Sequence, residues 1–295
     1  MHQPVARRPY GLTGIEVSVL GLGAAQLGDH AVPEAIAASL LDMAQDAGVN
    51  LIDTAPSYGE SEARLGRALR GRRNRFVLST KLGYGVPGTE DWTGPCIAGG
   101  IERALQRLDT DVIDLVHLHS CPGEVATRDD ILQALADAKT AGKVRAIAYS
   151  GENADLLQAA RSARFDGLMA SLNLFDQRIV DELLAGNTRG FIAKRALANA
   201  PWRYAQLPVG DYCEPYWRRL QAMQLAPADG MPWGELALRF VLAQPGVSAL
   251  IVGTAQPAHW TDAIAWAARG ALDAATTAHW RAAFKQHDND WIGQV

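Results

Sequence analysis

The sequence predicts an α/β fold: a (β/α)8 TIM barrel of parallel strands with a short N-terminal β-hairpin. Eight short segments rich in apolar and β-branched residues alternate with eight amphipathic segments, the strand and helix count of such a barrel. Most of the strand segments are apolar on both faces, as a parallel sheet covered by helices requires. A length of 295 residues suits one barrel of this kind.

The expected elements follow from hydrophobic periodicity and from residues that begin or end helices. Pro33 fits the start of a helix, because the N–H that it lacks has no partner there. Gly48 and Gly142 follow helical segments, where a left-handed residue often ends the helix. Strands are expected at residues 17–22, 49–53, 76–81, 112–119, 144–150, 167–172, 190–193 and 247–252, and helices at 33–47, 61–69, 97–108, 129–141, 153–160, 177–184, 234–244 and 257–268.

The other segments are interpreted as a hairpin and as loops. Thr13-Gly14 is expected to turn the hairpin between strands at 10–12 and 15–19. Long loops are expected at 84–95 and 197–232, and such loops on a barrel often line a pocket. The sequence shows no internal repeat and no linker rich in Ser, Pro or Gly, so residues 1–295 are expected to form a single domain.

Composition excludes several classes of protein. The chain has 28 Lys+Arg against 32 Asp+Glu, and a net charge of −4 argues against a nucleic-acid partner. No apolar run reaches the ~18 residues of a membrane helix, and no secretory signal is seen at the start. Cys96, Cys121 and Cys213 are scattered, which predicts neither a disulfide framework nor a metal site and favours a cytoplasmic location.

Polar residues stand at the carboxyl ends of the expected strands, where barrel enzymes place their active groups. Asp53 ends the second strand, Tyr58 follows in the next loop, Lys81 ends the third strand and His119 ends the fourth. Each residue alone has an ordinary structural explanation, such as capping a turn or reaching solvent. A carboxylate, a phenol, an amine and an imidazole that converge on one rim indicate a catalytic site.

Two histidines on the fourth strand compete for the role of the rim histidine. His117 and His119 have the same parity, so both side chains point to the same side of the strand. His119 lies nearer the carboxyl-terminal rim, where the chemistry is expected. His117 is expected one layer lower, as a hydrogen-bonded histidine of the barrel interior.

Several segments resemble the sequence signatures of the aldo-keto reductases. They are VSVLGLGAAQLG, LIDTAPSYGESEARLGRAL, VLSTKLG, DVIDLVHLHS, GKVRAIAYSG and ALIVGTAQPAHW, and the likeness covers nearly the whole chain in the right order. The resemblance implies a (β/α)8 barrel that transfers hydride between a nicotinamide cofactor and a small-molecule carbonyl or alcohol. It also implies a catalytic tetrad of Asp53, Tyr58, Lys81 and His119.

The chemistry of the four side chains supports these roles. A carbonyl that receives hydride becomes an alkoxide and needs a positioned proton donor. A free tyrosine has a pKa of about 10, and we expect the Lys81 ammonium to lower the pKa of Tyr58. Asp53 is expected to keep Lys81 charged and oriented, and His119 to hydrogen-bond the substrate oxygen.

The resemblance also implies which residues hold the cofactor. It assigns cofactor contacts to Gly23, Ala24, Asp53, Ser150, Gly151, Met169, Lys194, Arg195, Leu197, Gly253, Thr254, Gln256, His259 and Asp262. The sequence departs from the family pattern at three positions of this list near the nicotinamide end, and at His259 near the adenosine end. Gly151 follows Ser150 where the family has Asn, Met169 stands in place of Gln, and Lys194 stands in place of the aromatic that stacks on nicotinamide.

Cofactor preference depends on the residue that faces the adenosine end. His259 aligns with the arginine that usually holds the 2′-phosphate, and an imidazole holds a phosphate less firmly than a guanidinium fork. NADP(H) is the family's usual cofactor and is expected in preference to NAD(H), which stays an open alternative.

The substrate pocket is expected to include Ala25, Gln26, Tyr58, Trp92, His119 and Trp202, together with the C-terminal tail. Ala25 stands where the family often has an aromatic wall, which predicts a more open pocket. The alternatives to a carbonyl reductase are a sugar-type alcohol dehydrogenase working oxidatively with NAD, a non-catalytic cofactor-binding regulatory barrel, and a barrel enzyme that uses Lys81 as a Schiff-base amine. The sequence favours no oligomeric state.

Overall fold

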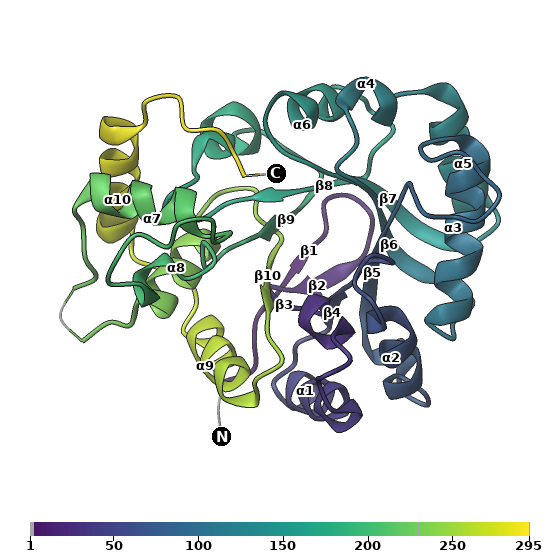
Figure 1. Cartoon of the computed structure of the whole chain (residues 1–295), viewed down its shortest axis with the longest axis horizontal. Coiled ribbons are helices and arrows are strands. Elements are labelled where there is room, and N and C mark those ends of the chain that lie inside the picture. Colours follow the sequence, from purple (N-terminus) through teal and green to yellow (C-terminus); the bar gives the residue numbers. More distant parts are fainter. Residues whose placement is uncertain (1–2, 229, 295) are drawn as a thin grey trace.

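A closed barrel of eight parallel strands forms the centre of the computed structural model, which describes residues 3–228 and 230–294 (Figure 1). The strands pair in the order β10-β3-β4-β5-β6-β7-β8-β9. The barrel strands are β3 (Leu20–Gly23), β4 (Leu51–Asp53), β5 (Val77–Leu82), β6 (Ile113–His119), β7 (Val144–Ser150), β8 (Gly167–Ser171), β9 (Gly190–Lys194) and β10 (Ala249–Gly253). The expected (β/α)8 barrel is confirmed.

The expected first strand is divided between two sheets. β2 (Glu16–Ser18) pairs antiparallel with β1 (Arg7–Pro9), and β3 then enters the barrel at Leu20. The N-terminal hairpin is therefore confirmed, but its expected bounds are wrong. Residues 10–15 form the turn, in which Tyr10 N donates to Ile15 O at 2.8 Å.

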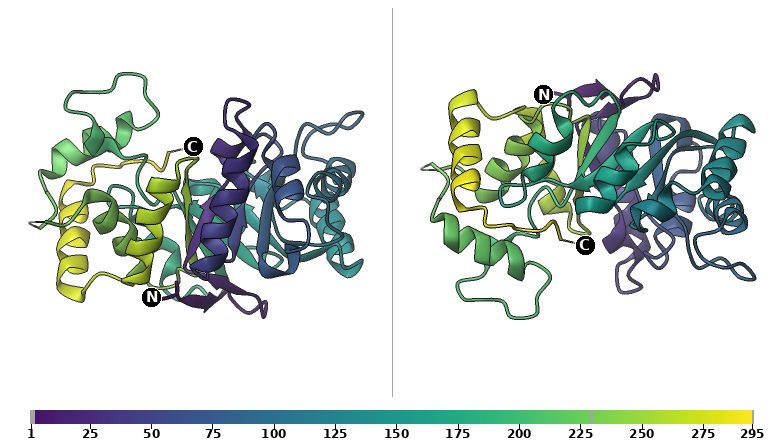
Figure 2. Two further views of the ribbon diagram at one scale, coloured as in Figure 1. Left: turned by 90° about the horizontal axis from the view of Figure 1, so that it is seen from below. Right: turned by 90° about the horizontal axis from the view of Figure 1, so that it is seen from above.

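The hairpin closes the amino-terminal end of the barrel with a tyrosine. Tyr10 is fully buried in the apolar cluster of the barrel interior. A Cβ on Gly167 or Gly190 would lie within 2.4 Å of its ring or hydroxyl, so the two glycines make room for it. Figure 2 shows the hairpin and the C-terminal tail at opposite ends of the barrel, so the hairpin does not cover the carboxyl-terminal end of the strands.

Helices surround the barrel. They are α1 (Glu34–Asp46), α2 (Ser61–Ala68), α3 (Gly94–Arg107), α4 (Gly123–Ala126), α5 (Asp129–Thr140), α6 (Asn153–Ala160), α7 (Glu214–Met223), α8 (Trp233–Leu242), α9 (Pro257–Ala268) and α10 (Ala274–His287). Gly48 and Gly142 follow α1 and α5 with φ of 79° and 73°, as expected for residues that end helices.

Three helices were not expected, and one expected helix has π-helical rather than α-helical geometry over most of its length. α7 lies within the expected loop 197–232, and α4 and α10 lie outside the expected helices. α10 has a weak pattern, because Trp280 and Phe284 are its only buried residues. In the expected helix 177–184, Val180–Leu184 forms one π-helical turn, which directly follows two α-helical residues at 178–179.

Side chains alternate between the barrel interior and the helix layer. Leu51, Val77, Leu115, Met169 and Ile192 fill the lower interior, and the residues between them on each strand pack against the helices. Because the period of a strand is two residues, the interior side chains nearer the rim are polar and include Asp53, Ser79, Lys81 and His117. The barrel thus has an apolar floor under a polar mouth.

Candidate active site

Strand register brings the sequence-predicted acid, amine and imidazoles together at the mouth of the barrel. Asp53 on β4 is level with Ser79 on β5, and Lys81 on β5 is level with His117 on β6. His119, two residues further along β6, is level with Ser150 on β7. The stagger of a barrel therefore places His119 higher at the rim than the other groups.

A buried ion pair forms the base of this site. Lys81 Nζ donates to Asp53 Oδ2 at 2.6 Å and to Thr54 O at 2.8 Å. Ser79 Oγ donates to Asp53 Oδ1 at 2.8 Å, and Asp53 and Lys81 are each 2% exposed. Burial lowers the pKa of Lys81, but Asp53 and then Tyr58 outweigh burial and leave this pKa above its ordinary value. Lys81 is therefore held as an ammonium.

Tyr58 lies beside this ammonium, with Lys81 Nζ 4.8 Å from the centroid of its ring. Burial raises the pKa of Tyr58, and the charge of Lys81 opposes this effect without overcoming it. The expected net lowering of the pKa is therefore wrong in direction, although Lys81 does contribute in that direction. A phenol with a raised pKa is protonated at neutral pH, the form that can donate to an alkoxide.

His119 contacts two tyrosine rings. Its Nδ1 lies 2.6 Å from Tyr84 Oη, and its ring stacks on Tyr84 at a centroid distance of 5.6 Å. The Tyr58 ring meets it edge-on at 6.1 Å. Burial, together with the charges of Lys81 and Lys194, lowers the pKa of His119 to about 3, so the imidazole is neutral.

Sequence reasoning missed Tyr84. It begins the long loop that follows β5, three residues after Lys81, and the sequence pattern indicates only a loop residue there. A hydrogen-bonding side chain directly after a rim strand was the available signal.

His117 lies below His119, fully buried, as its parity predicts. Its Nδ1 is 3.3 Å from Ser79 Oγ, and among the described residues Nε2 has no hydrogen-bond partner. Burial lowers the pKa of His117 to about 4, so this imidazole is neutral as well. His117 thus links the floor of the barrel to the Asp53–Ser79 contact.

Ser150 offers an unpaired group at the mouth. It is fully buried at the end of β7, and its Oγ has no partner within the described part of the chain. A buried hydroxyl without a partner is costly, unless a ligand supplies the missing hydrogen bond. A carboxamide offers both a donor and an acceptor to such a hydroxyl, so this position fits the nicotinamide end of the implied cofactor.

Lys194 is engaged by an acidic residue that sequence reasoning did not single out. Its Nζ lies 3.1 Å from Glu152 Oε1, and an Arg195 guanidinium nitrogen lies 3.3 Å from the same oxygen. Ser171 also donates to Glu152 Oε1, from its hydroxyl at 2.7 Å. Lys194 has the interior parity of Ile192, so its stem and charge face the mouth from β9.

The loop after β9 adopts an unusual backbone at the rim. Arg195, Ala198, Asn199 and Ala200 have φ between 48° and 57°, and such left-handed residues cost about 1–2 kcal/mol each when they are not glycine. Leu197, within this run, packs against the outer core. Strain of this kind often accompanies ligand-binding loops.

Some expected cofactor residues are buried rather than displayed. Ala24 and Met169 are fully buried, and Met169 belongs to the apolar floor. Gly23 is level with Gly253, and a Cβ on Gly253 would meet the Gln26 amide at 2.7 Å. Gly253 and Gln26 are exposed at the mouth.

The N-terminus of α9 lies next to the end of β10. Gln256 N donates to Thr254 Oγ1 at 2.9 Å, and α9 starts at Pro257. His259 and Asp262 are exposed on its first turns. Helix N-termini present unpaired N–H groups that bind phosphate, so this corner can hold the charged part of a dinucleotide.

The expected substrate residues separate into two groups. Ala25 is exposed at the mouth, and Trp92 packs on Tyr84 at 5.7 Å between ring centroids. Trp202 instead stacks on Trp233 of α8 at 5.5 Å, in an aromatic cluster of the helix layer. The structure therefore gives Trp92 an indirect contact with His119 and gives Trp202 a packing role.

The C-terminal tail runs from α10 toward the middle of the molecule (Figure 1). Gly293 N donates to Asn153 Oδ1 at 2.7 Å, and Asn153 Nδ2 donates back to Gly293 O at 3.0 Å. Gln294 also contacts Arg195 and Tyr212. These bonds fix the tail beside the Glu152 and Arg195 cluster.

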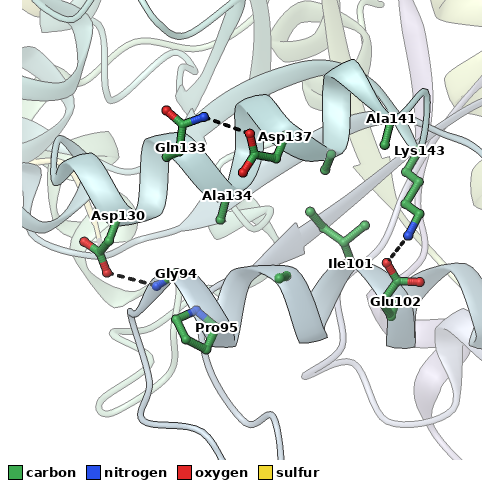
Figure 3. Close-up of a pocket in the computed structure, with 12 residues that line it drawn as sticks. Gly94, Pro95, Ile101, Glu102, Asp130, Gln133, Ala134, Asp137, Ala141 and Lys143 are labelled. Atoms are coloured by element: carbon green, nitrogen blue, oxygen red, sulfur yellow. Dashed lines mark hydrogen bonds and ion pairs between the residues drawn. The ribbon is translucent and has the colours of Figure 1, made fainter.

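A groove between α3 and α5 is not part of this site (Figure 3). Its polar side chains already have partners: Asp130 accepts from Gly94 N at 2.9 Å, and Lys143 donates to Glu102. It lies between two helices of the outer layer.

Two further features bear on the class of site. Among the described residues, no group of three or more His, Cys, Asp or Glu side chains is arranged to hold a metal ion. In the same residues, no helix is both long and apolar enough to cross a membrane.

The chain is a (β/α)8 barrel whose carboxyl-terminal mouth holds a tyrosine, a buried lysine–carboxylate pair and a neutral histidine. This combination defines a class of barrel enzyme. The model of the aldo/keto reductase family matches residues 19–285. The chain belongs to this family, whose members are oxidoreductases that act on carbonyls or alcohols with nicotinamide cofactors.

Two relatives are similar in sequence to this protein over most of its length. An uncharacterized oxidoreductase of Bacillus subtilis, YqkF, is 28% identical over 85% of this chain and 87% of its own. The D-threo-aldose 1-dehydrogenase of a Pseudomonas species is 30% identical over 86% of this chain and 91% of its own.

Solved structures of aldo-keto reductases are also similar to this protein. PA4992 of Pseudomonas aeruginosa, assigned to the aldo-keto reductases, is 35% identical, with a TM-score of 0.71 over 89% of this chain and 94% of its own. The holo form of AKR11C1 from Bacillus halodurans has a TM-score of 0.83 at 24% identity, covers 95% of this chain and 96% of its own, and shows the fold alone.

Proposed function

We propose that this chain reduces an aldehyde or ketone with a nicotinamide cofactor, with Tyr58 as the proton donor and Lys81, Asp53 and His119 as its catalytic partners. The proposal depends mainly on one observation: the Lys81–Asp53 ion pair, with an N···O distance of 2.6 Å, lies beneath the Tyr58 ring. The bound cofactor supplies hydride to the carbonyl carbon. Residues 1–295 act in this proposal as one domain.

Each side chain has a distinct task. Tyr58 donates its hydroxyl proton to the oxygen that becomes an alkoxide. The Lys81 ammonium stabilises the phenolate that remains, and Asp53 holds Lys81 in place at 2.6 Å. The neutral imidazole of His119 hydrogen-bonds the same substrate oxygen and orients the carbonyl.

The protonated form of Tyr58 fits the reductive direction, in which its hydroxyl is the donor. Burial raises its pKa, so the hydroxyl holds its proton at neutral pH. An alcohol dehydrogenase would need the phenolate as its base, and this form is rare under the same conditions. A sugar alcohol oxidised with NAD remains the second candidate, because one relative is named a D-threo-aldose 1-dehydrogenase.

The Schiff-base and non-catalytic alternatives receive less support. Lys81 is an ammonium that donates to Asp53 and to Thr54 O, whereas a Schiff-base lysine must lose its proton to attack a carbonyl. A binding barrel would have no need of a buried lysine against a tyrosine ring.

We also propose the parts of the cofactor site. The unpaired Ser150 hydroxyl receives the carboxamide, the start of α9 with Thr254 and Gln256 receives phosphate, and Lys194 lies near the ring. NADP(H) is the proposed cofactor. NAD(H) competes with it, because His259 is the only basic side chain in the first turns of α9 and it is exposed.

The test is a panel of aldehydes, ketones and sugars, each assayed with both cofactors in reduced and oxidised form. We expect turnover of a carbonyl with the reduced cofactor and a higher kcat/KM for NADPH than for NADH. Turnover of alcohols alone would overturn the direction. A substrate adduct on Lys81 trapped by borohydride would overturn the mechanism.

A further inference from the structure

Tyr84 is a second phenol at the mouth of the barrel, and it is bonded to the histidine rather than to the catalytic tyrosine. Its Oη lies 2.6 Å from His119 Nδ1 and 2.9 Å from Ser57 Oγ. The three side chains form one chain of hydrogen bonds from an exposed hydroxyl to the imidazole.

Packing holds Tyr84 in this place. Its ring lies between His119, at a centroid distance of 5.6 Å, and Trp92, at 5.7 Å. The loop turns back on itself here, because Trp92 N donates to Gly83 O at 2.7 Å. Gly83 has a φ of 134°, and a Cβ on it would lie 1.9 Å from the Trp92 ring, so only glycine allows this arrangement.

The hydrogen-bond chain can run in two directions, and they have opposite effects on His119. If Tyr84 donates to Nδ1, the single proton of the neutral ring lies on Nε2, which becomes a donor. If Nδ1 carries the proton, Tyr84 accepts it and donates to Ser57, and Nε2 becomes an acceptor. Only the first arrangement can hydrogen-bond a carbonyl oxygen through Nε2.

The chemistry of the groups selects the first direction. A phenol is a stronger acid than the N–H of a neutral imidazole, and the lone pair of an imidazole nitrogen is a better acceptor than a phenol oxygen. The short O···N distance of 2.6 Å agrees with a phenol that donates to nitrogen. The 2.9 Å contact has Tyr84 donating to Ser57, so the first direction requires the exposed Ser57 hydroxyl to rotate and donate to Tyr84 Oη, or to turn to water.

We propose that Tyr84 is a positioning residue that fixes His119 as the Nε2–H tautomer and aims its N–H at the substrate oxygen. Tyr84 acts through His119 and needs no contact with substrate or cofactor. This inference rests on the proposed role of His119 in carbonyl reduction, which it deepens.

The test reads the tautomer directly, in protein labelled with nitrogen-15 histidine. Two-bond correlations identify the protonated ring nitrogen, and His119→Gln assigns the His119 signals. The wild type is expected to carry the proton on Nε2. In Tyr84→Phe, which keeps the stacked ring, we expect a mixture of tautomers and a fall in kcat/KM of about tenfold, with cofactor affinity unchanged.

Two variants serve as controls. Tyr204→Phe removes another tyrosine hydroxyl, which is bonded to Asp211 at 2.6 Å in the long loop after β9, and should change neither the tautomer nor kcat/KM. Ser57→Ala should keep the Nε2–H tautomer, because Tyr84 still has its proton to donate.

Several results would overturn the proposal. They are a proton on Nδ1 in the wild type, a tautomer that shifts in Ser57→Ala, an unchanged tautomer and kcat/KM in Tyr84→Phe, and an equal loss in Tyr204→Phe. The tautomer is read without substrate, so an absence of carbonyl reduction in the wild type would refute the proposed function and leave the histidine result standing.

Discussion

Removal of the Lys81 charge tests both the stability and the chemistry of the site. Lys81→Met keeps a side chain of similar length but leaves the Asp53 carboxylate, which is 2% exposed, without its cation. Breaking a buried pair in this way costs about 3–5 kcal/mol of unfolding free energy, because one charge stays buried and unpaired. Asp53 keeps one hydrogen bond, from Ser79 at 2.8 Å, which favours the lower end of that range.

The matched double variant Asp53→Asn with Lys81→Met removes both charges. We expect it to lie within about 1–2 kcal/mol of the wild type, since the stability penalty arises from the unpaired charge rather than from the lost attraction. Carbonyl reduction should stay lower by about 10²–10⁴ in both variants, because Tyr58 lacks its ammonium in each.

The assays are urea unfolding, followed by tryptophan fluorescence, and steady-state kinetics. A double variant no more stable than Lys81→Met would refute the argument from the unpaired charge. Full activity in Lys81→Met would refute the role assigned to the ammonium.

Three further predictions concern the pH dependence of stability, the Glu152 cluster, and Tyr10 at the amino-terminal end of the barrel. His117 and His119 have folded pKa values of about 4 and about 3, below the unfolded value of about 6.5, so the unfolded chain binds more protons and stability should fall as pH decreases from 6.5 toward 4. His117→Gln should flatten this dependence in urea unfolding at several pH values, and an unchanged slope would contradict the burial of a neutral His117. Glu152→Gln leaves Lys194 and Arg195 facing each other without their carboxylate. We expect the free energy of unfolding, measured by thermal unfolding, to fall by about 2–4 kcal/mol. A fall of less than about 0.5 kcal/mol would show that the cluster does not stabilise the fold. Gly190→Ala places a Cβ 2.4 Å from the Tyr10 ring and should cost about 1–3 kcal/mol in the same assay, and an unchanged stability would contradict this close fit.

The barrel could be predicted because each of its strands has its own local signal. Short apolar segments separated by amphipathic ones determine the count of strands, and glycines such as Gly48 and Gly142 mark where helices end. The first strand was misplaced because residues 17–22 are mostly apolar and form one continuous strand-like segment, whereas a change of sheet after Ser18 depends on pairing with β1. α7 and α10 were missed because aromatic residues in a long polar stretch resemble a pocket lining as much as a helix face.

The site could be predicted in part. Strand-end position indicates Asp53, Lys81 and His119, since parity and register follow from the fold. Glu152 and Tyr84 could not be ranked in the same way, because their roles depend on contacts across strands, with Lys194 at 3.1 Å and with His119 at 2.6 Å. The direction of the Tyr58 pKa was wrong because the sequence gives no measure of its burial, which outweighs the nearby ammonium.

The most direct test of the account is the effect of Tyr58→Phe on carbonyl reduction, measured beside the dissociation constant of the reduced cofactor. The substitution removes one oxygen and keeps the ring over which Lys81 Nζ lies at 4.8 Å. We predict that kcat/KM falls by at least about 100-fold while cofactor affinity stays within about twofold of the wild type. A variant that retains wild-type kcat/KM would contradict the assignment of Tyr58 as the proton donor.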